Sequence, residues 1–172
     1  MVLLVFICNS GLKVIRGDFI AKDALKFFQA YIKEMIDIGG NNLPKAISTK
    51  SGSKLGKLYK ERGLALDLGT ALKQIYSALK AKPLIKKLND NTYEVIIKYS
   101  KKFCPIGGAH NPSRAPIFQE NICIPYTRGF LNEVFPQFTF KSEILSCILL
   151  NNQRTCHYIL KIENKKNINQ MT

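Results

Sequence analysis

A chain of 172 residues with 46% hydrophobic and 10% aromatic residues can bury one ordinary core. This composition excludes a disordered protein, and no apolar run is long enough to span a bilayer. The net charge of +14 is concentrated, because residues 44–102 hold 14 Lys or Arg against 4 Asp or Glu. This charge allows nucleic-acid binding as an alternative function, although no recognition motif accompanies it.

The chain opens with an apolar run over residues 1–8, which ends in Cys8. The run is too short to cross a membrane and lacks the features of a signal peptide. We expect a buried or intersubunit strand there, with Cys8 as a small buried hydrophobe, in a cytoplasmic protein. Residues 1–163 are predicted to form a single domain, followed by a polar tail over residues 164–172.

Helical periodicity dominates the first half of the chain. Apolar residues at helical spacing predict helices over residues 19–38 and 64–80, and a strongly basic helix is expected between them over residues 53–62. Asp18 is placed to cap the first of these helices, and the glycines that follow it predict a loop over residues 41–44. Pro83 ends the third helix, because a residue that precedes proline is disfavoured in helical conformation.

After Pro83 the pattern is typical of strands. Alternating or short apolar runs predict two strands, over residues 84–88 and 93–99. An irregular segment over residues 104–116 then leads to a helix that is expected to begin near Pro125. A hairpin follows from Phe138. Helices succeeded by mostly antiparallel strands indicate an α+β fold.

The hairpin carries a cysteine on either side of its expected turn. If Asn151 and Asn152 form a two-residue turn, Cys147 faces Cys156 directly across the strands. Cβ atoms of opposed residues lie roughly 4.5–5.5 Å apart, so the two sulfurs could share a metal ion, form a disulfide or simply be buried. The odd count of five cysteines, without a secretory signal, argues against a disulfide framework.

Cys104 and Cys123 lie upstream in a loop-rich segment and bring the candidate site to four thiols. Four cysteines are a common closed arrangement for structural zinc, with no open position for catalysis. The histidines, His110 and His157, are expected to be a polar loop residue and a surface residue. A catalytic Cys–His pair is therefore weakly supported.

Several residues of the second half have a spacing that a known family shares: Cys123, Tyr126, Gly129, Cys147, Cys156 and Tyr158. In this spacing and in its element order, the chain resembles the 4-vinyl reductase domain family, also called the hydrocarbon-binding domain. It is most similar to the stand-alone archaeal members, over roughly residues 14–163.

The resemblance implies a helical layer packed on an antiparallel sheet, a fold shared with small subunits of the TRAPP tethering complex. It also implies a homodimer and a pocket for a small hydrophobic or aromatic ligand between helices and sheet. Phenol-sensing members hold a structural zinc on three cysteines and a glutamate. The matching cysteines are Cys123, Cys147 and Cys156.

The chain departs from that family in its hairpin. The family glutamate position is Ile144 here, and the nearest carboxylate, Glu143, would lie about 13 Å from Cys147 in a regular strand. We therefore expect Cys104 as the fourth zinc ligand, with Glu143 as the alternative. The turn at residues 151–153 is also one residue longer than is usual in the family and lacks its glycine.

The expected function is that of a zinc-containing, non-catalytic domain that senses or carries a small hydrophobic molecule. The family name suggests a vinyl reductase or a tetrapyrrole-pathway accessory protein as an alternative, although the chain has no dinucleotide-binding fingerprint. The further alternatives are a basic zinc protein that binds nucleic acid and an assembly subunit of the TRAPP type.

Overall fold

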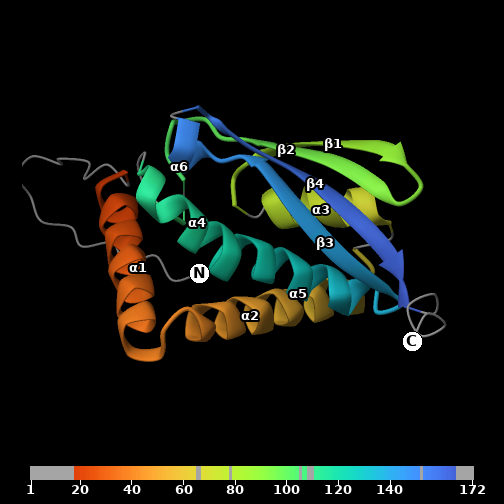
Figure 1. Ribbon diagram of the computed structural model, residues 1–172, viewed down its shortest axis with the longest axis horizontal. Coiled ribbons are helices and arrows are strands. Elements are labelled where there is room, and N and C mark those ends of the chain that lie inside the picture. The colour runs from red at the N-terminus through yellow and green to blue at the C-terminus, as the bar shows by residue number, and fades with distance from the viewer. Residues whose placement is uncertain are drawn as a thin grey trace, which may run out of the picture.

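A computed structural model describes residues 18–64, 67–77, 79–104, 106–107, 111–151 and 153–165. In this part of the chain, helices pack on a four-stranded antiparallel sheet, which confirms the predicted α+β class (Figure 1). The expectations for residues 1–8 and for His110 lie outside the described residues. The described helices include none that is long and apolar enough to cross a membrane.

The first helix, α1 (Asp18–Gly39), agrees with its prediction, whereas α2 (Asn42–Glu61) is longer than expected. The predicted loop over residues 41–44 is wrong, because α2 already begins at Asn42. Pro44 lies in its first turn, where the backbone N–H groups have no helical partner and proline is tolerated. The third helix, α3 (Leu68–Ser77), is shorter than predicted, and the Asp67 carboxylate accepts hydrogen bonds from the Thr70 backbone N–H and hydroxyl.

Glycines allow α2 to pack closely against α5 (Ile124–Val134). A Cβ atom on Gly52 would overlap the carbonyl oxygen of Tyr126, and one on Gly129 would overlap that of Thr49. A Cβ atom on Gly56 would lie 2.7 Å from the carbonyl oxygen of Phe130. The two helix backbones are therefore in contact at positions where no larger residue fits.

The helix predicted to begin near Pro125 begins ten residues earlier, at Ala115, so that prediction is wrong. After a 3₁₀ turn, η1 (Pro112–Arg114), the chain continues through α4 (Ala115–Phe118), the π-helical turn η2 (Gln119–Cys123) and α5. The π turn opens the hydrogen-bond ladder just before Pro125, so the missing N–H of that proline does not end the helix. Cys123 consequently lies in a helix rather than in a loop.

The sheet order is β1-β2-β4-β3, with antiparallel pairing between all neighbours. The strands are β1 (Lys82–Asn89), β2 (Thr92–Lys98), β3 (Phe138–Ser146) and β4 (Thr155–Asn164). Even-numbered residues of β3 and β4 face the helices, including Phe140, Tyr158 and Leu160, which are buried.

The connection between β3 and β4 differs from the predicted two-residue turn. A bulge at Leu145 shifts the pairing by one residue, and a short helix, α6 (Ile148–Asn151), follows Cys147. Ile148 and Leu149 are buried in this helix, with exposed fractions of 2% and 1%. The apolar run after Cys147 thus turns inward to bury its side chains instead of extending the strand.

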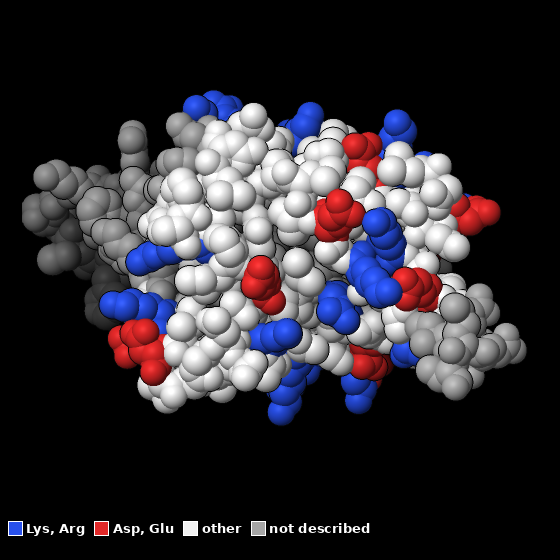
Figure 2. Space-filling view, in the orientation of Figure 1, with Lys and Arg blue, Asp and Glu red and all other residues white. Residues whose placement is uncertain are grey.

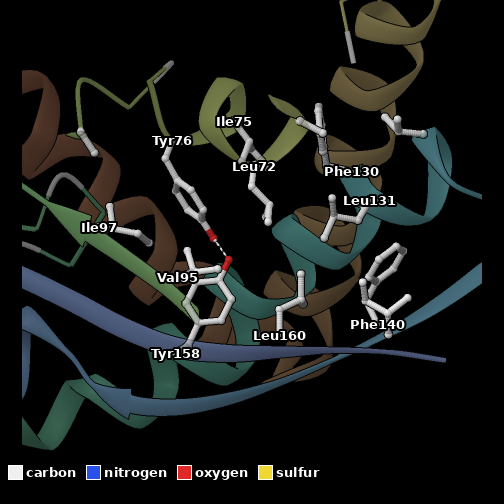
Figure 3. Close-up of a cluster of buried hydrophobic side chains, with 14 residues drawn as sticks. Leu72, Ile75, Tyr76, Val95, Ile97, Phe130, Leu131, Phe140, Tyr158 and Leu160 are labelled. Carbon is white, nitrogen blue, oxygen red and sulfur yellow. Dashed lines mark hydrogen bonds between the residues drawn. The ribbon is translucent and has the colours of Figure 1, made fainter. Parts of the chain in front are cut away.

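The core consists of two apolar clusters. The larger lies between α3, α5 and the sheet, and contains Leu72, Phe130, Leu131, Val95 and Leu160 (Figure 3). The smaller joins α1, α4 and α6 through side chains such as Ile32, Phe118 and Leu149. Tyr99 and Cys156 pack against both clusters, and the candidate site lies where the clusters meet.

Candidate ligand-binding cavity

A partly enclosed, largely apolar cavity lies between the helical layer and the sheet. Phe118, Cys123 and Tyr126 line it from the helical side, and Ile97 and Ile144 line it from the sheet. The π turn contributes to the wall at both of its ends, through Gln119 and Cys123. Such turns recur at functional sites, because the extra residue changes where neighbouring side chains point.

The cavity has a volume of about 60 Å³. One buried water needs about 10–15 Å³, whereas an engineered apolar cavity that binds benzene has about 150 Å³. A ligand with one ring therefore needs side chains of the wall to move or extends through the open side of the cavity. Buried waters persist where several polar groups hold them, whereas apolar walls favour an apolar occupant.

The cysteines of the candidate zinc site, Cys104, Cys123, Cys147 and Cys156, all line this cavity. The hydrogen bond between the Cys147 and Cys156 side chains lowers the pKa of Cys147 and raises that of Cys156. Burial raises the pKa of the Cys123 thiol, and the neighbouring sulfurs raise it further. The Cys104 sulfur accepts a hydrogen bond of 3.2 Å from the backbone N–H of Gly107.

The alternative zinc ligand, Glu143, is not brought together with these cysteines. Its side chain is exposed on the other face of β3 and accepts a hydrogen bond of 3.1 Å from Lys161. Among the described residues, no group of three or more Cys, His, Asp or Glu is arranged to hold a metal ion as the side chains stand. Zinc binding by the four cysteines stays a prediction.

Buried hydroxyls form a hydrogen-bonded chain in the cavity wall, which the sequence analysis missed. The Tyr76 hydroxyl lies 2.6 Å from that of Tyr158 (Figure 3). It also lies 3.1 Å from the hydroxyl of Thr127. Burial raises the pKa of both tyrosines, so both remain protonated near neutral pH. The spacing of Leu72, Ile75 and Tyr76 on one helical face was a signal that could have revealed Tyr76.

Further polar atoms of the wall are buried without a hydrogen-bond partner among the described residues. These are the Ser142 hydroxyl oxygen and the Gln119 amide nitrogen. The Gln119 side chain interacts with the Cys147 sulfur and so lowers the pKa of Cys147, but no hydrogen bond of good geometry satisfies its amide nitrogen. Because an unsatisfied buried polar group is costly, each of these atoms indicates a missing partner.

The basic residues do not gather around the cavity. Lysines of α2 such as Lys50, Lys54 and Lys57 are exposed at the edge of the helical layer and border a groove that also contains Glu133. Figure 2 shows lysines and arginines interspersed with acidic residues on the visible face. His157 is paired with Glu94 at 3.1 Å. Nucleic-acid binding stays a prediction from composition.

Comparison with known proteins identifies structural relatives. No protein-family model matches the chain, and no curated protein matches it in sequence. Subunit 3 of the trafficking protein particle complex from Naegleria fowleri, covalently bound to palmitic acid, matches with a TM-score of 0.58 and 14% identity, over 86% of this chain and 97% of that chain. The phenol-responsive sensory domain of the transcription activator PoxR, with phenol, matches with a TM-score of 0.49 and 15% identity, over 86% of this chain and 79% of that chain.

The match to the trafficking subunit spans nearly the whole of that protein and confirms the α+β fold. It agrees with the fold that the resemblance implied, in which a helical layer covers an antiparallel sheet. Fold alone does not assign a function, because one fold carries many different sites. Membership of the 4-vinyl reductase family stays a prediction.

Proposed function

We propose that this domain binds a small, largely apolar molecule in the cavity between its helices and its sheet, as a sensor or carrier of the hydrocarbon-binding type. The observation that carries the proposal is the cavity itself, which interrupts an otherwise close-packed core at the junction of two clusters. Protein interiors seldom leave such space without a function, since each void sacrifices packing energy.

A structural relative supports the same function. The trafficking subunit that shares this fold was crystallised covalently bound to palmitic acid, so the fold is able to accommodate an apolar ligand. Apolar walls with a few polar groups are also the usual construction of small-molecule sites. The proposal assigns binding to this cavity and assigns no reaction.

Fluorobenzene is a suitable probe, because it is uncharged, has a single ring and is observed directly by ¹⁹F NMR. We expect its resonance to broaden and shift as the protein is added, with saturable binding. Ser146→Phe should abolish this binding, since Ser146 lines the cavity from β3 and a phenyl ring there fills the space. Native mass spectrometry of the freshly purified protein should also reveal any molecule that the cavity retains.

Leu145→Phe is the matched control for this variant. Leu145 is the preceding residue of β3 and has an exposed fraction of 50%, so the added ring lies in solvent. We expect Leu145→Phe to bind fluorobenzene like the wild type. Saturable binding that survives Ser146→Phe would place the probe elsewhere and refute the proposed site, and so would an absence of binding to the wild type.

A further inference from the structure

The cavity wall has hydrogen-bond donors without acceptors, and these donors indicate which kind of ligand the cavity binds. The Ser142 hydroxyl and the Gln119 amide nitrogen are buried in this wall without partners among the described residues. An amide nitrogen can only donate, and a serine hydroxyl donates one hydrogen bond. The serine oxygen can also accept, but only an acceptor on the ligand can satisfy both atoms, so the wall favours a ligand with a hydrogen-bond acceptor.

The chain of buried hydroxyls adds to this excess of donors. Tyr76, Tyr158 and Thr127 carry one O–H donor each, and the two contacts that link them use two of these donors. The donor left over belongs to a hydroxyl that lines the same cavity. Ser142 and Tyr158 are one diagonal step apart on the inner face of the β3–β4 pair, since Ser142 pairs with Leu160 and Ile144 with Tyr158.

The wall provides no positively charged side chain to stabilise an anion. No Lys, Arg, Asp or Glu among the described residues lines the cavity, and the His157 ring is paired with Glu94. A carboxylate placed there would lose its hydration without gaining an opposite charge, which is far more costly than burying a neutral oxygen. The wall thus disfavours anionic ligands.

We infer that the ligand carries an uncharged oxygen acceptor, such as that of a ketone, an ester or an ether, which the Ser142 hydroxyl binds, with the Gln119 amide as a second donor. This inference rests on the proposed function and narrows it from apolar molecules in general to neutral oxygenated ones. Plain hydrocarbons of the same shape leave the donors of the wall unsatisfied.

Cyclohexanone and methylenecyclohexane test this inference, because they share one ring and size and differ in C=O against C=CH₂. Their dissociation constants are measured by displacement of fluorobenzene from the full-length protein. We expect Ser142→Ala to raise the dissociation constant of cyclohexanone by about 5- to 10-fold relative to that of methylenecyclohexane, because the complex loses one hydrogen bond. Gln119→Leu should also raise the dissociation constant of cyclohexanone relative to that of methylenecyclohexane.

Thr139→Val is the matched control, because it removes a hydroxyl from the same strand outside the cavity wall. This variant should leave the ratio of the two dissociation constants unchanged. Retained fluorobenzene binding shows that each variant has folded. Cyclohexanecarboxylate should fail to displace the probe from the wild type.

The outcomes separate the two proposals. If fluorobenzene binds but Ser142→Ala leaves the ratio of the two dissociation constants unchanged, the Ser142 hydroxyl binds an ordered water instead of the ligand. The inference is then overturned, while the proposed function remains. Displacement by cyclohexanecarboxylate as strong as that by cyclohexanone would overturn the requirement for a neutral ligand. If fluorobenzene does not bind the wild type at all, the proposed function fails and the inference fails with it.

Discussion

Replacing Gly129 by alanine tests the close packing of α2 and α5. The added methyl group would lie 3.0 Å from the carbonyl carbon of Thr49 and 3.1 Å from its Cα, and closer still to the carbonyl oxygen. Ordinary contact begins at about 3.4 Å, so α2 would have to retreat by roughly 1 Å. A gap of that size forfeits about a quarter to a half of the dispersion energy of the contacts around it.

The expected free-energy change combines two opposing effects. Overpacking against backbone, which cannot rotate aside, costs about 3 kcal/mol, the upper end of the usual range. Alanine in place of glycine favours a helix by about 1 kcal/mol. The net loss is therefore about 2 kcal/mol, or a fall in Tm of roughly 4–8 °C for a chain of this size.

Thermal unfolding followed by circular dichroism measures this fall in Tm. Ser51→Ala is the control, because Ser51 is an exposed neighbour of Gly52 on α2 and its change should stay within about 0.5 kcal/mol. A Gly129→Ala protein that melts at or above the wild-type temperature would refute the backbone contact between these helices.

Further predictions concern the hydroxyl chain, the α3 cap and zinc. Tyr76→Phe should destabilise the protein by about 1 kcal/mol more than Tyr158→Phe in urea unfolding, because it removes two hydrogen bonds and leaves two hydroxyls without a partner, whereas Tyr158→Phe removes one bond and leaves Tyr76 bonded to Thr127; equal losses would contradict the chain. Asp67→Ala should cost about 1 kcal/mol by removing the hydrogen bonds to Thr70. Those bonds lower the pKa of Asp67, so the stability that Asp67 contributes is fully present above its ordinary pKa of 3.8 and is lost as the pH falls through the lowered pKa. If the stability difference between Asp67→Ala and the wild type does not shrink in acid, the cap is refuted. Native mass spectrometry should show one zinc per chain that Cys147→Ser loses, and equal native and denatured masses of the wild type would contradict the zinc prediction.

The sequence predicted the elements whose signals are local. The apolar spacing of α1 and the alternation in β2 depend on residues within each element, and both were placed within a residue or two. The start of α2 was missed, because Pro44 reads as a breaker unless the helix is known to begin at Asn42. The contact that Gly52 and Gly56 of α2 make with α5 could not be predicted either, because α5 is distant in the sequence.

The sequence analysis named the cysteines of the candidate site but not its other polar residues. Cys104, Cys123, Cys147 and Cys156, the predicted zinc ligands, all line the cavity, whereas their binding of zinc stays a prediction. The turn between Cys147 and Cys156 was wrong, because burial of the α6 side chains overrides the turn preference of asparagine. No local pattern marks the inward-facing Ser142 hydroxyl as unpaired, since that depends on which atoms surround it after folding.

The π turn η2 (Gln119–Cys123) has a consequence for how this helix can vary. A π turn is in effect a one-residue insertion in an α-helix, and one residue corresponds to about 100° of rotation around the helix axis. The insertion therefore sets the orientation of α4, whose Phe118 lines the cavity, relative to α5, which lines the cavity through Tyr126 and contacts α2 at Gly129. Deletion of one codon within η2 would rotate Phe118 away from the cavity while α5 keeps its contacts with the cavity and with α2.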